Sequence, residues 1–537
     1  MKQKKLTGIK LFLFAFFAVT VFLPLIFMLR NIGDADMGQI LSSQQFQNGL
    51  KNSLLLAFCA TIISLVLATV LAFCIERSQI RHKNLLTFLL TLPMLIPSIS
   101  HGMGLVILFG QNGFLTNLLG LDFSIYGFGG VLTGSVLYSF PVAFLMMLDV
   151  IRYEDCSSYD AADILGIPKV NQFLRITLPY LRKPLINIAF AVFTLVITDY
   201  GVPLMVGGKF STLPVVMYEE VIGLLNFDKG SVIGLILLIP ATLAFVIDLF
   251  CQDRGVHSYV VAKKNLAKNK VRDALAKGFC ILVCLFVALP IVAFCLLSVM
   301  KKYPVDISLS LDNILKSFQM GAGNYLINAL IIAAFVTVLG TVISYLTAYL
   351  TARTPGVSSR ALHLFSITSM AIPGMVLGLS YALVYKGSFL YGTLAILIMV
   401  NLTHFFSSPY LIAYNSFNKV NKNLESVAVT LGVNRFYLLK DVLIPQMKGT
   451  ILEMLSYFFV NCMMTISAVS FLFTTRTMPI SLMITQFEAQ MLIECSAFVS
   501  IIILGVNVFV KCLLTYLRNR QARKEELPGG AKIPSAD

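Results

Sequence analysis

Long apolar runs recur along the whole chain, and they constrain its fold more than any other feature. A helix of about 20 residues crosses the roughly 30 Å hydrocarbon core of a bilayer. A segment in lipid must also satisfy its own backbone hydrogen bonds, which favours helix. We expect spans near residues 11–29, 53–75, 85–109, 130–148, 186–206, 231–250, 279–300, 326–350, 361–384, 393–413, 449–472 and 496–516. The sequence therefore predicts an all-α polytopic membrane protein with about 12 transmembrane helices.

The composition supports a membrane location. Hydrophobic residues make up 57% of the chain and charged residues only 12%. A soluble protein of this composition would expose large apolar patches and aggregate. The first run follows MKQKKLTGIK but is longer than the apolar part of a usual signal peptide, so we expect it to be retained as a span.

The basic residues predict the orientation. With the N-terminus in the cytoplasm and the loops alternating, most of the 41 Lys and Arg residues lie in cytoplasmic segments, as the positive-inside rule requires. Both termini are then cytoplasmic. The net charge of +15 is explained by this asymmetry, and we expect no nucleic-acid partner because no soluble domain presents a basic face.

Cysteine and histidine give no sign of a metal centre. The ten cysteines include no CxxC pair and no Cys/His group with zinc-ligand spacing. Most lie in or near the apolar runs, where a cysteine packs as a small hydrophobe. We expect no metal, no cofactor and no catalytic residue on this chain, because neither a Ser/His/Asp set nor paired carboxylates occur at one membrane face.

Two polar loops echo each other at a fixed distance. Residues 160–179 read DAADILGIPKVNQFLRITLP, and residues 426–445 read SVAVTLGVNRFYLLKDVLIP. An offset of 266 places Gly166 on Gly432 and Pro179 on Pro445. Both loops therefore keep the same spacing from the glycine to the proline.

The spans repeat as well. NSLLLAFCATIISLVLATVLAF from Asn52 resembles NALIIAAFVTVLGTVISYLTAY from Asn328 at an offset of 276, which also pairs Pro97 with Pro373. The chain is predicted to be two parallel six-helix repeats, a layout that suggests a pathway between the halves. We divide it into repeat one (1–251), a basic cytoplasmic linker (252–278), repeat two (279–517) and a cytoplasmic tail (518–537).

Each polar loop is predicted to form a helix–turn–helix. A glycine at 166 and at 432 is suited to a left-handed helix end, Pro168 to the first turn of the next helix, and Asn434 to a helix cap. An interfacial helix that packs on lipid headgroups is the simpler interpretation of either loop alone. Such a helix needs no fixed register, so the shared spacing favours a docking element that meets two equivalent partners.

These loops resemble the cytoplasmic signature loop of binding-protein-dependent ABC importer permeases, which reads Glu-Ala-Ala, three residues, Gly, nine residues, Ile-x-Leu-Pro. The first copy matches through Asp160, Ala161, Ala162, Gly166, Ile176, Leu178 and Pro179, with Asp in place of the usual Glu. The second copy matches less well, through Ser426, Ala428, Gly432, Ile444 and Pro445, with Glu425 one residue early. Because the second copy departs from the signature, the two loops are not expected to be strictly equal in the free energy with which they dock.

The resemblance implies partners. In that family the loop rests on an ATPase subunit and passes its closure to the spans, so we expect two copies of an ABC ATPase and an extracytoplasmic solute-binding protein. The chain has no GxxxxGK[ST] segment, and Gly207-Gly208-Lys209-Phe210 lacks the upstream glycine and the hydroxyl residue. ATP and magnesium are therefore expected on the partner ATPase, in a bacterial cytoplasmic membrane.

A few polar residues in the spans are candidates for a translocation pathway. Ionisable residues inside spans are costly and often functional, which singles out Asp199, and related permeases suggest Thr465 and Ser467 in the equivalent span. The alternative is that Asp199 caps a helix and that the hydroxyls bond back to their own helix.

The cargo is the least constrained prediction. Double-length permeases of this layout resemble importers of 2-aminoethylphosphonate, ferric iron or thiamine, and the stretch LPMLIPSISHGMGLVILFG favours the phosphonate type, then ferric iron. The alternative function is a 12-span secondary transporter driven by an ion gradient. Such carriers typically have a Gly-x-x-x-Asp-Arg-x-Gly-Arg-Arg loop, whereas the corresponding loop reads ERSQIRHKN.

Overall fold

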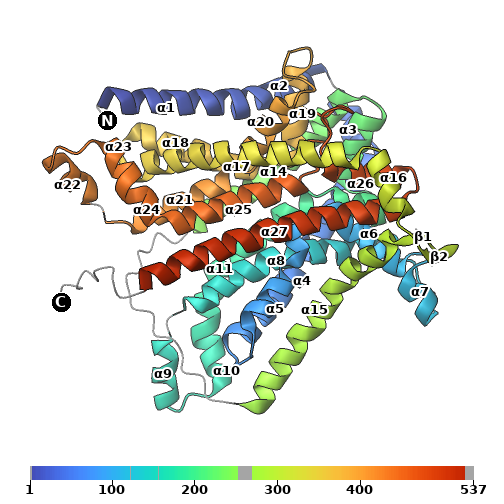
Figure 1. Cartoon of the computed structure of the whole chain (residues 1–537), viewed down its shortest axis with the longest axis horizontal. Helices are drawn as coiled ribbons and strands as arrows, with labels where there is room; N and C mark the ends of the chain where they lie inside the picture. Colours follow the sequence, from blue (N-terminus) through green and yellow to red (C-terminus); the bar gives the residue numbers. More distant parts are fainter. Residues whose placement is uncertain are drawn as a thin grey trace. The chain divides into compact units, whose positions relative to one another are not determined.

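The computed structural model describes residues 3–34, 36–120, 122–154, 156–251, 269–421 and 423–526. The described residues are overwhelmingly helical (Figure 1), which confirms the all-α class. Their one sheet is an antiparallel pair, β1 (Met300–Lys302) with β2 (Asp306–Leu309). The basic part of the predicted linker, 252–268, and the end of the tail, 527–537, lie outside the described residues.

The spans number nine to eleven in the part of the chain that the structure describes. Nine helical segments are long and apolar enough to cross a membrane: Thr7–Asn31, Gln44–Glu76, Ser98–Leu119, Phe128–Arg152, Lys169–Ile197, Phe227–Ile247, Lys270–Ser298, Ala322–Arg353 and Ile493–Arg520. Two bent pairs, Val357–Ala371 with Gly374–Tyr385 (105°) and Leu394–His404 with Ser407–Lys419 (48°), add two more. The expected span at 449–472 forms a helix of only 17 residues, Lys448–Met464, which measures about 25 Å.

The helices fall into two compact units. We name each by its longest central helix. The α4 unit covers Asn31–Met320 and Ile484–Ile501, and the α17 unit covers the described residues up to Arg30, Gly321–Met483 and those from Ile502.

The α4 unit contains η2 (Ile32–Asp34), α3 (Met37–Ser42), α4 (Gln44–Glu76), α5 (Lys83–Leu90), η3 (Leu92–Leu95), α6 (Ser98–Phe109), α7 (Phe114–Leu119), α8 (Phe128–Arg152), α9 (Ser157–Ile164), α10 (Lys169–Gln172), η4 (Phe173–Thr177), α11 (Leu178–Ile197), α12 (Gly201–Val206), α13 (Leu213–Tyr218), η5 (Glu219–Gly223), α14 (Phe227–Cys251), α15 (Lys270–Ser298), the sheet and α16 (Asp312–Gln319). In Figure 1, α9 and α10 lie at one end of α8 and α11, while α7, β1, β2 and α16 gather at the other end of this unit.

The α17 unit contains α1 (Gln3–Phe17), η1 (Ala18–Phe22), most of α2 (Leu23–Asn31), α17 (Ala322–Arg353), α18 (Val357–Thr368), η6 (Ser369–Ala371), α19 (Gly374–Tyr385), α20 (Leu394–His404), α21 (Ser407–Lys419), α22 (Leu424–Thr430), α23 (Arg435–Tyr437), η7 (Leu438–Leu443), α24 (Ile444–Gln446) and α25 (Lys448–Met464). The division between the units falls within α26 (Ile480–Ala489) and α27 (Ile493–Glu526).

The long helices place small residues inside and large apolar residues outside. On α4 the fully buried face carries Ala57, Ala60, Ser64, Ala68 and Ala72, and the exposed face carries Leu55, Phe58, Ile62, Val66 and Val70. Small residues let helices approach closely, as membrane helix packing requires. Ser64 and Ser139 accordingly meet across α4 and α8 with their hydroxyl oxygens 2.8 Å apart.

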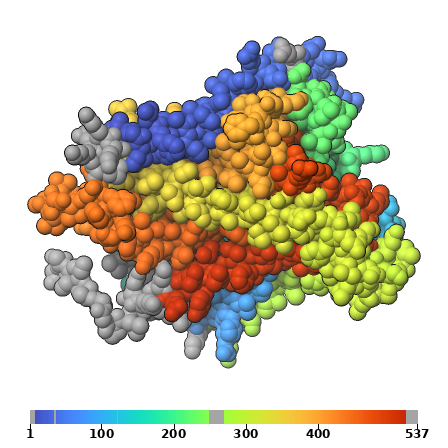
Figure 2. Space-filling model, turned by 45° about the horizontal axis from the view of Figure 1, so that its top comes forward, coloured from blue at the N-terminus to red at the C-terminus, as the bar shows by residue number. Residues whose placement is uncertain are grey.

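The α17 helix follows the same rule. A Cβ at Gly340 would lie 2.7 Å from the ring of Phe458 on α25, so only glycine permits this approach. Phe335, Val338 and Val342 are each more than half exposed on the other side of the helix. Figure 2 shows α17 as a continuous yellow band on one face of the molecule, and lipid is the natural solvent for this surface.

The first helix of each repeat belongs to the compact unit of the other repeat. The N-terminal helix lies in the α17 unit, where Tyr381 and Tyr385 donate hydroxyl hydrogens to the carbonyls of Thr20 (2.8 Å) and Val19 (3.1 Å). These carbonyls sit in η1, a widened π turn that leaves carbonyls free for such bonds. Reciprocally, α15 lies in the α4 unit, where Pro290 packs against Gly104.

The structure confirms the duplication at its closest contacts. A Cβ at Gly102 would lie 3.2 Å from the carbonyl oxygen of Val202, and one at Gly378 would lie 2.6 Å from that of Ala468. The two pairs match at the sequence offsets of 276 and 266. The predicted breaks after Pro97 and Pro373 are also present, since α6 and α19 begin directly after these prolines.

Several helices begin or end at other residues than the predicted ranges. The span at 186–206 is interrupted, because α11 ends at Ile197 and α12 begins at Gly201. Residues 270–278, assigned to the linker, form the first turns of α15. The assigned tail is helical as far as Glu526, because α27 continues through its polar end.

Candidate functional site

The first polar loop is a pair of short helices joined by a tight turn. Gly166 ends α9 with φ +68°. Its N–H donates to the carbonyl of Asp163 (3.1 Å), and the N–H of Ile167 donates to that of Ala162 (3.0 Å). This is the two-bond pattern of a Schellman end, for which glycine is the least strained residue. Pro168 precedes α10 as its N-cap, one position earlier than predicted.

The second loop repeats this backbone. Gly432 also has φ +68°, and its N–H donates to the carbonyl of Val429 (3.1 Å). The N–H of Val433 donates to the carbonyl of Ala428 (2.8 Å). The predicted cap is confirmed, because the side chain of Asn434 accepts from the N–H of Phe436 (3.2 Å). The two loops therefore share one turn geometry.

Both loops continue into a widened π turn. In the first, η4 includes Ile176 and is followed by Leu178 and Pro179 at the start of α11. In the second, η7 is followed by Ile444 and Pro445 in α24. Proline lacks an N–H, and its ring clashes with the carbonyl four residues earlier. The wider π turn before Pro179 and Pro445 relieves that clash in both loops.

Each loop exposes apolar side chains next to its glycine. Leu165 is 75% exposed and Leu431, its counterpart, is 71% exposed. Asp160, Ala161 and Ser426 are exposed, whereas Ala162 and Ala428 are buried at the same register position. Exposed apolar groups that lie next to one another on a surface are typical of interaction sites.

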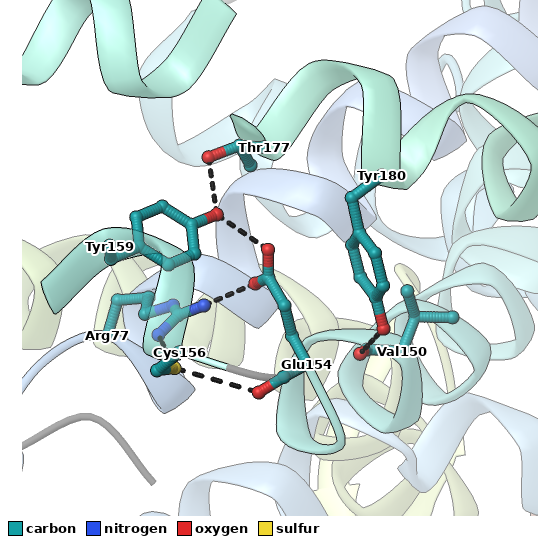
Figure 3. Close-up of polar contacts among 7 residues, drawn as sticks. All are labelled: Arg77, Val150, Glu154, Cys156, Tyr159, Thr177 and Tyr180. Atoms are coloured by element: carbon teal, nitrogen blue, oxygen red, sulfur yellow. Dashed lines mark hydrogen bonds and ion pairs between the residues drawn. The ribbon is translucent and has the colours of Figure 1, made fainter. Parts of the chain in front are cut away.

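The first loop is attached through a buried ion pair that the sequence analysis missed (Figure 3). Arg77, at the end of α4, pairs with Glu154 and stacks 5.1 Å from the ring centre of Tyr159. The Tyr159 hydroxyl donates to Glu154 Oε1 (2.6 Å) and lies 2.6 Å from Thr177 Oγ1. Burial, and then the hydrogen bond to Glu154, raise the pKa of the Tyr159 phenol above its usual range.

A second polar contact crosses the turn of the first loop. Gln172 donates from its amide to Asp163 Oδ1 (2.6 Å) and to the carbonyl of Ile167 (2.8 Å). Lys169 pairs with the same carboxylate. These bonds connect α9 to α10 directly.

The second loop is attached by a different arrangement. Arg353 ends α17 and donates from Nε and Nη2 to the two carboxylate oxygens of Glu425 (2.6 and 2.5 Å). It also donates to the carbonyls of Val420 (2.9 Å) and Asn421 (2.6 Å). Glu425, which stands one residue before the acidic position of the signature, is therefore held by this pair.

One signal in the sequence points to these arginines. Arg77 and Arg353 are related by the offset of 276 that aligns the second span of each repeat. Their carboxylate partners are not equivalent, because the offset of 266 places Glu425 on Tyr159 and Glu154 on Val420. The repeat therefore marks the cations, while only the fold identifies what they bind.

The candidate pathway residues lie at interrupted helices. Asp199 caps α12 by accepting from the N–H groups of Gly201 (3.3 Å) and Val202 (3.1 Å). Thr465 follows α25 and donates back to the carbonyl of Asn461 (2.8 Å). Ser467 packs against Gly374, where a Cβ would lie 2.3 Å from its hydroxyl oxygen. A role of these residues in a pathway stays a prediction.

Comparison with known proteins identifies the family. A family model described as "Binding-protein-dependent transport system inner membrane component" matches residues 67–252 and again 340–523. The chain belongs to this family. It is a double-length permease of the ABC importer type and a multi-pass inner-membrane protein, and one match lies in each half of the chain.

Relatives of two sizes match the permease. The ferric transport system permease protein FbpB of Actinobacillus pleuropneumoniae is 24% identical over 481 residues, which cover 86% of this chain and 69% of the relative. A putative ferric transport system permease protein FbpB 1 of Haemophilus influenzae is 25% identical, covering 82% and 72%. The molybdate/tungstate transport system permease protein WtpB of Methanocaldococcus jannaschii is 27% identical over 237 residues, covering 44% of this chain and 92% of the relative. The last match spans one repeat.

Proposed function

We propose that this permease moves its cargo inward under the control of two ATPase subunits, one bound at each polar loop. We call residues 157–179 and 424–446 the coupling loops. The observation that carries the proposal is their equivalence: both end the first helix at a left-handed glycine, expose a leucine beside it and continue through a π turn into a proline. A docking element that meets two identical partners needs this repetition, whereas a lipid-facing helix does not.

The exposed leucines offer a direct test. We expect Leu165→Asp and Leu431→Asp each to lower the recovery of the ATPase with the purified permease by about tenfold, because each places a charge in an apolar contact. Leu224→Asp is the matched control, since Leu224 is 70% exposed but lies outside both loops. The measurement is the ratio of ATPase to permease after mild-detergent purification. Two ATPases per wild-type chain support the proposal, and unchanged recovery in both variants contradicts it.

We propose ferric iron as the cargo. Three relatives each cover more than four-fifths of this chain, and all three are named as ferric or Fe(3+) permeases. The initial preference for a phosphonate rested on one stretch of the third span and gains nothing from these relatives, so it moves behind ferric iron. The family match also leaves the ion-coupled secondary transporter without support.

Uptake assays can test the cargo and the pathway together. Cells that lack the permease should regain uptake of radioactive ferric ion when the wild-type gene is returned, and uptake of 2-aminoethylphosphonate should not change. If Asp199, Thr465 and Ser467 face the pathway, Asp199→Asn should alter the uptake rate while the ATPase still purifies with the permease. Loss of assembly would show instead that Asp199 acts through its cap on α12.

A further inference from the structure

One short segment between two spans is folded with its polar side inward. It consists of the hairpin of β1 and β2 and the helix α16, and it belongs to the α4 unit (Figure 1). We call residues 300–319 the interfacial segment. On α16, Asn313 is only 8% exposed, whereas Leu315 is 58% exposed. A helix that borders water has the opposite arrangement, with its apolar residues inside and its polar residues outside. We therefore expect the surroundings of this segment to be apolar.

The buried polar groups of α16 are satisfied within the segment. The amide of Asn313 donates to the carbonyls of Met300 (2.6 Å) and Lys301 (3.0 Å) on β1. The buried hydroxyl of Ser317 donates to the carbonyl of Asn313 (2.7 Å). These bonds hold the hairpin and α16 together as one piece, so the inward position of the polar side is built into the fold.

Large apolar side chains are exposed on both parts of the segment. Ile307 and Leu309 lie two residues apart on β2 and therefore share one face of the strand. Leu311, Leu315 and Phe318 follow the spacing of one helix face, opposite the buried Asn313 and Ser317. An exposed apolar surface of this kind in a membrane protein needs a partner that is itself apolar.

The length of α15 places the interfacial segment at a border of the bilayer. The uncharged part of α15, residues 278–298, measures about 31 Å, which matches the roughly 30 Å hydrocarbon core. The hairpin begins at Met300, directly after this part of the helix. The next span, α17, begins at Ala322, shortly after α16 ends at Gln319. The chain therefore holds the segment at the border from both of its ends.

The border in question lies at the opposite end of α15 from the first coupling loop. Asp273, in the first turn of α15, accepts from the N–H of Gln79 (3.0 Å). Gln79 closely follows Arg77, which holds the first coupling loop. If the coupling loops are cytoplasmic, the interfacial segment lies at the outer leaflet.

The charges of the segment favour an anionic lipid. Lys302 and Lys316 are exposed and make no ion pair with any residue that the structure describes, whereas Lys301 pairs with Asp306 (3.5 Å). Interfacial elements bind a bilayer through their apolar area and through the attraction of basic residues to acidic headgroups. The exposed apolar face of α15 also continues to Leu296, so the lipid-facing surface of the span leads into the segment.

The equivalent helix of the first repeat has the reverse polarity. The offset of 276 places Gln39 on the exposed Leu315 and Leu41 on the buried Ser317. The helix α3 therefore has a polar residue where α16 is apolar outside, and an apolar residue where α16 is polar inside. A requirement common to both repeats does not explain the surface of α16.

We propose that the interfacial segment lies in the outer leaflet, with its apolar side chains among the upper parts of the acyl chains. Lys302 and Lys316 bind the phosphates of anionic phospholipids. The contact with lipid does not depend on the proposed import function. Only the choice of leaflet does, through the location of the coupling loops.

The test uses the fact that the sequence contains no tryptophan. Ile307→Trp and Leu315→Trp each place a single fluorophore on the segment of a permease in nanodiscs without any partner protein. Leu285→Trp, exposed on α15, is the lipid reference, and Leu165→Trp, in the first coupling loop, is the water reference.

We expect lipids brominated near the headgroup end of their acyl chains to quench Ile307→Trp and Leu315→Trp strongly, because interfacial side chains reach about 5–10 Å into the bilayer. Lipids brominated deeper in the chain should quench these two variants less and Leu285→Trp more. Leu165→Trp should be quenched by acrylamide from the water phase and hardly at all by either lipid.

The lipid charge has its own readout. In the Ile307→Trp variant, brominated phosphatidylglycerol should quench about two- to threefold more than brominated phosphatidylcholine at the same mole fraction, because the lysines enrich anionic lipid nearby. Added salt should reduce the difference. Combining Lys302→Gln with Lys316→Gln should remove it. Lys51→Gln, which changes an exposed cation of α4 outside the segment, is the matched control and should not.

Two results would contradict the proposal. Quenching of Ile307→Trp and Leu315→Trp by acrylamide, with none by brominated lipid, would overturn it and indicate a surface for a protein partner. Equal quenching by the two brominated lipids would overturn the role of the lysines. Neither result would affect the import function, which is tested separately by recovery of the ATPase and by uptake of ferric ion.

Discussion

The two coupling loops share a backbone but not the side chains that hold it. In the first loop, Gln172 and Lys169 reach across the turn to Asp163. In the second, the equivalents of Asp163 and Gln172 are Val429 and Leu438, of which Leu438 is buried. The shape of each loop thus depends on its glycine and proline. The side chains that attach the loop to the rest of the protein differ between the two copies. The two loops therefore present the same turn but are held by different sets of side chains.

The largest effect is expected from Arg353→Ala, which breaks the attachment of the second loop. Arg353→Ala leaves the carboxylate of Glu425 unpaired and removes the donors to Val420 and Asn421. Breaking a buried pair by removing one partner costs about 3–5 kcal/mol. Hydrogen exchange of the loop amides should therefore accelerate by about two to four orders of magnitude. Arg77→Ala should cost less, because Glu154 keeps its bond from Tyr159.

The control for this comparison is Arg360→Ala, an exposed arginine on α18. It should leave exchange in both loops unchanged. Faster exchange in the first loop after Arg77→Ala than in the second after Arg353→Ala would reverse the ranking and contradict our account of the two supports.

An intermediate effect is expected at Tyr159, which has no counterpart hydroxyl in the second loop. Tyr159→Phe removes a donor to a buried carboxylate and should cost about 1.5–3 kcal/mol, seen as faster exchange in the first loop alone. The raised pKa of the phenol adds a pH dependence. Its stabilisation is fully present below the usual tyrosine pKa of about 10 and is lost as the pH rises through the raised value.

This pH dependence separates the loops. A fluorescent probe on Ala161→Cys should report loosening of the first loop above about pH 10, where an unperturbed tyrosine is half ionised. The same probe on Ser426→Cys should show no such change. The Tyr159→Phe background should abolish the transition. Parallel transitions in both loops would show that general alkaline unfolding, rather than Tyr159, controls the first.

The smallest effect should be equal in the two copies. Gly166→Ala and Gly432→Ala each force a side chain into φ +68°, and neither Cβ would meet an atom within 4 Å. The cost is then backbone strain alone, about 1–2 kcal/mol in each loop. Asparagine, which tolerates this conformation better, should cost less at both positions. If the two alanine substitutions cost different free energies, the glycine turn would not be equivalent in the two loops.

The fold was largely predictable because lipid imposes a local rule. The length of the apolar runs predicted the spans. The sequence offsets of 276 and 266 between the two halves predicted the duplication and the two glycine turns. The attachment of the loops was not predictable, because Arg77 and Glu154 are far apart in sequence and Glu425 is shifted by one residue from the signature. The break at Asp199 was missed for a similar reason, since a carboxylate that caps a helix inside an apolar run leaves the mean hydropathy high.

The exchange of first helices has a consequence for the synthesis of the protein. The N-terminal helix finds its packing partners, among them Tyr381 and Tyr385, only after a further stretch of about 350 residues has been made. At about 5–20 residues per second, this takes about 20–70 s. During that time the helix lacks these two hydrogen-bond partners, although its last residue, Asn31, can already bond to Asp228 and Ser231 on α14. A ribosome that stalls within the second repeat would therefore leave an orphan helix, which makes this segment a natural target for quality-control proteolysis in the membrane.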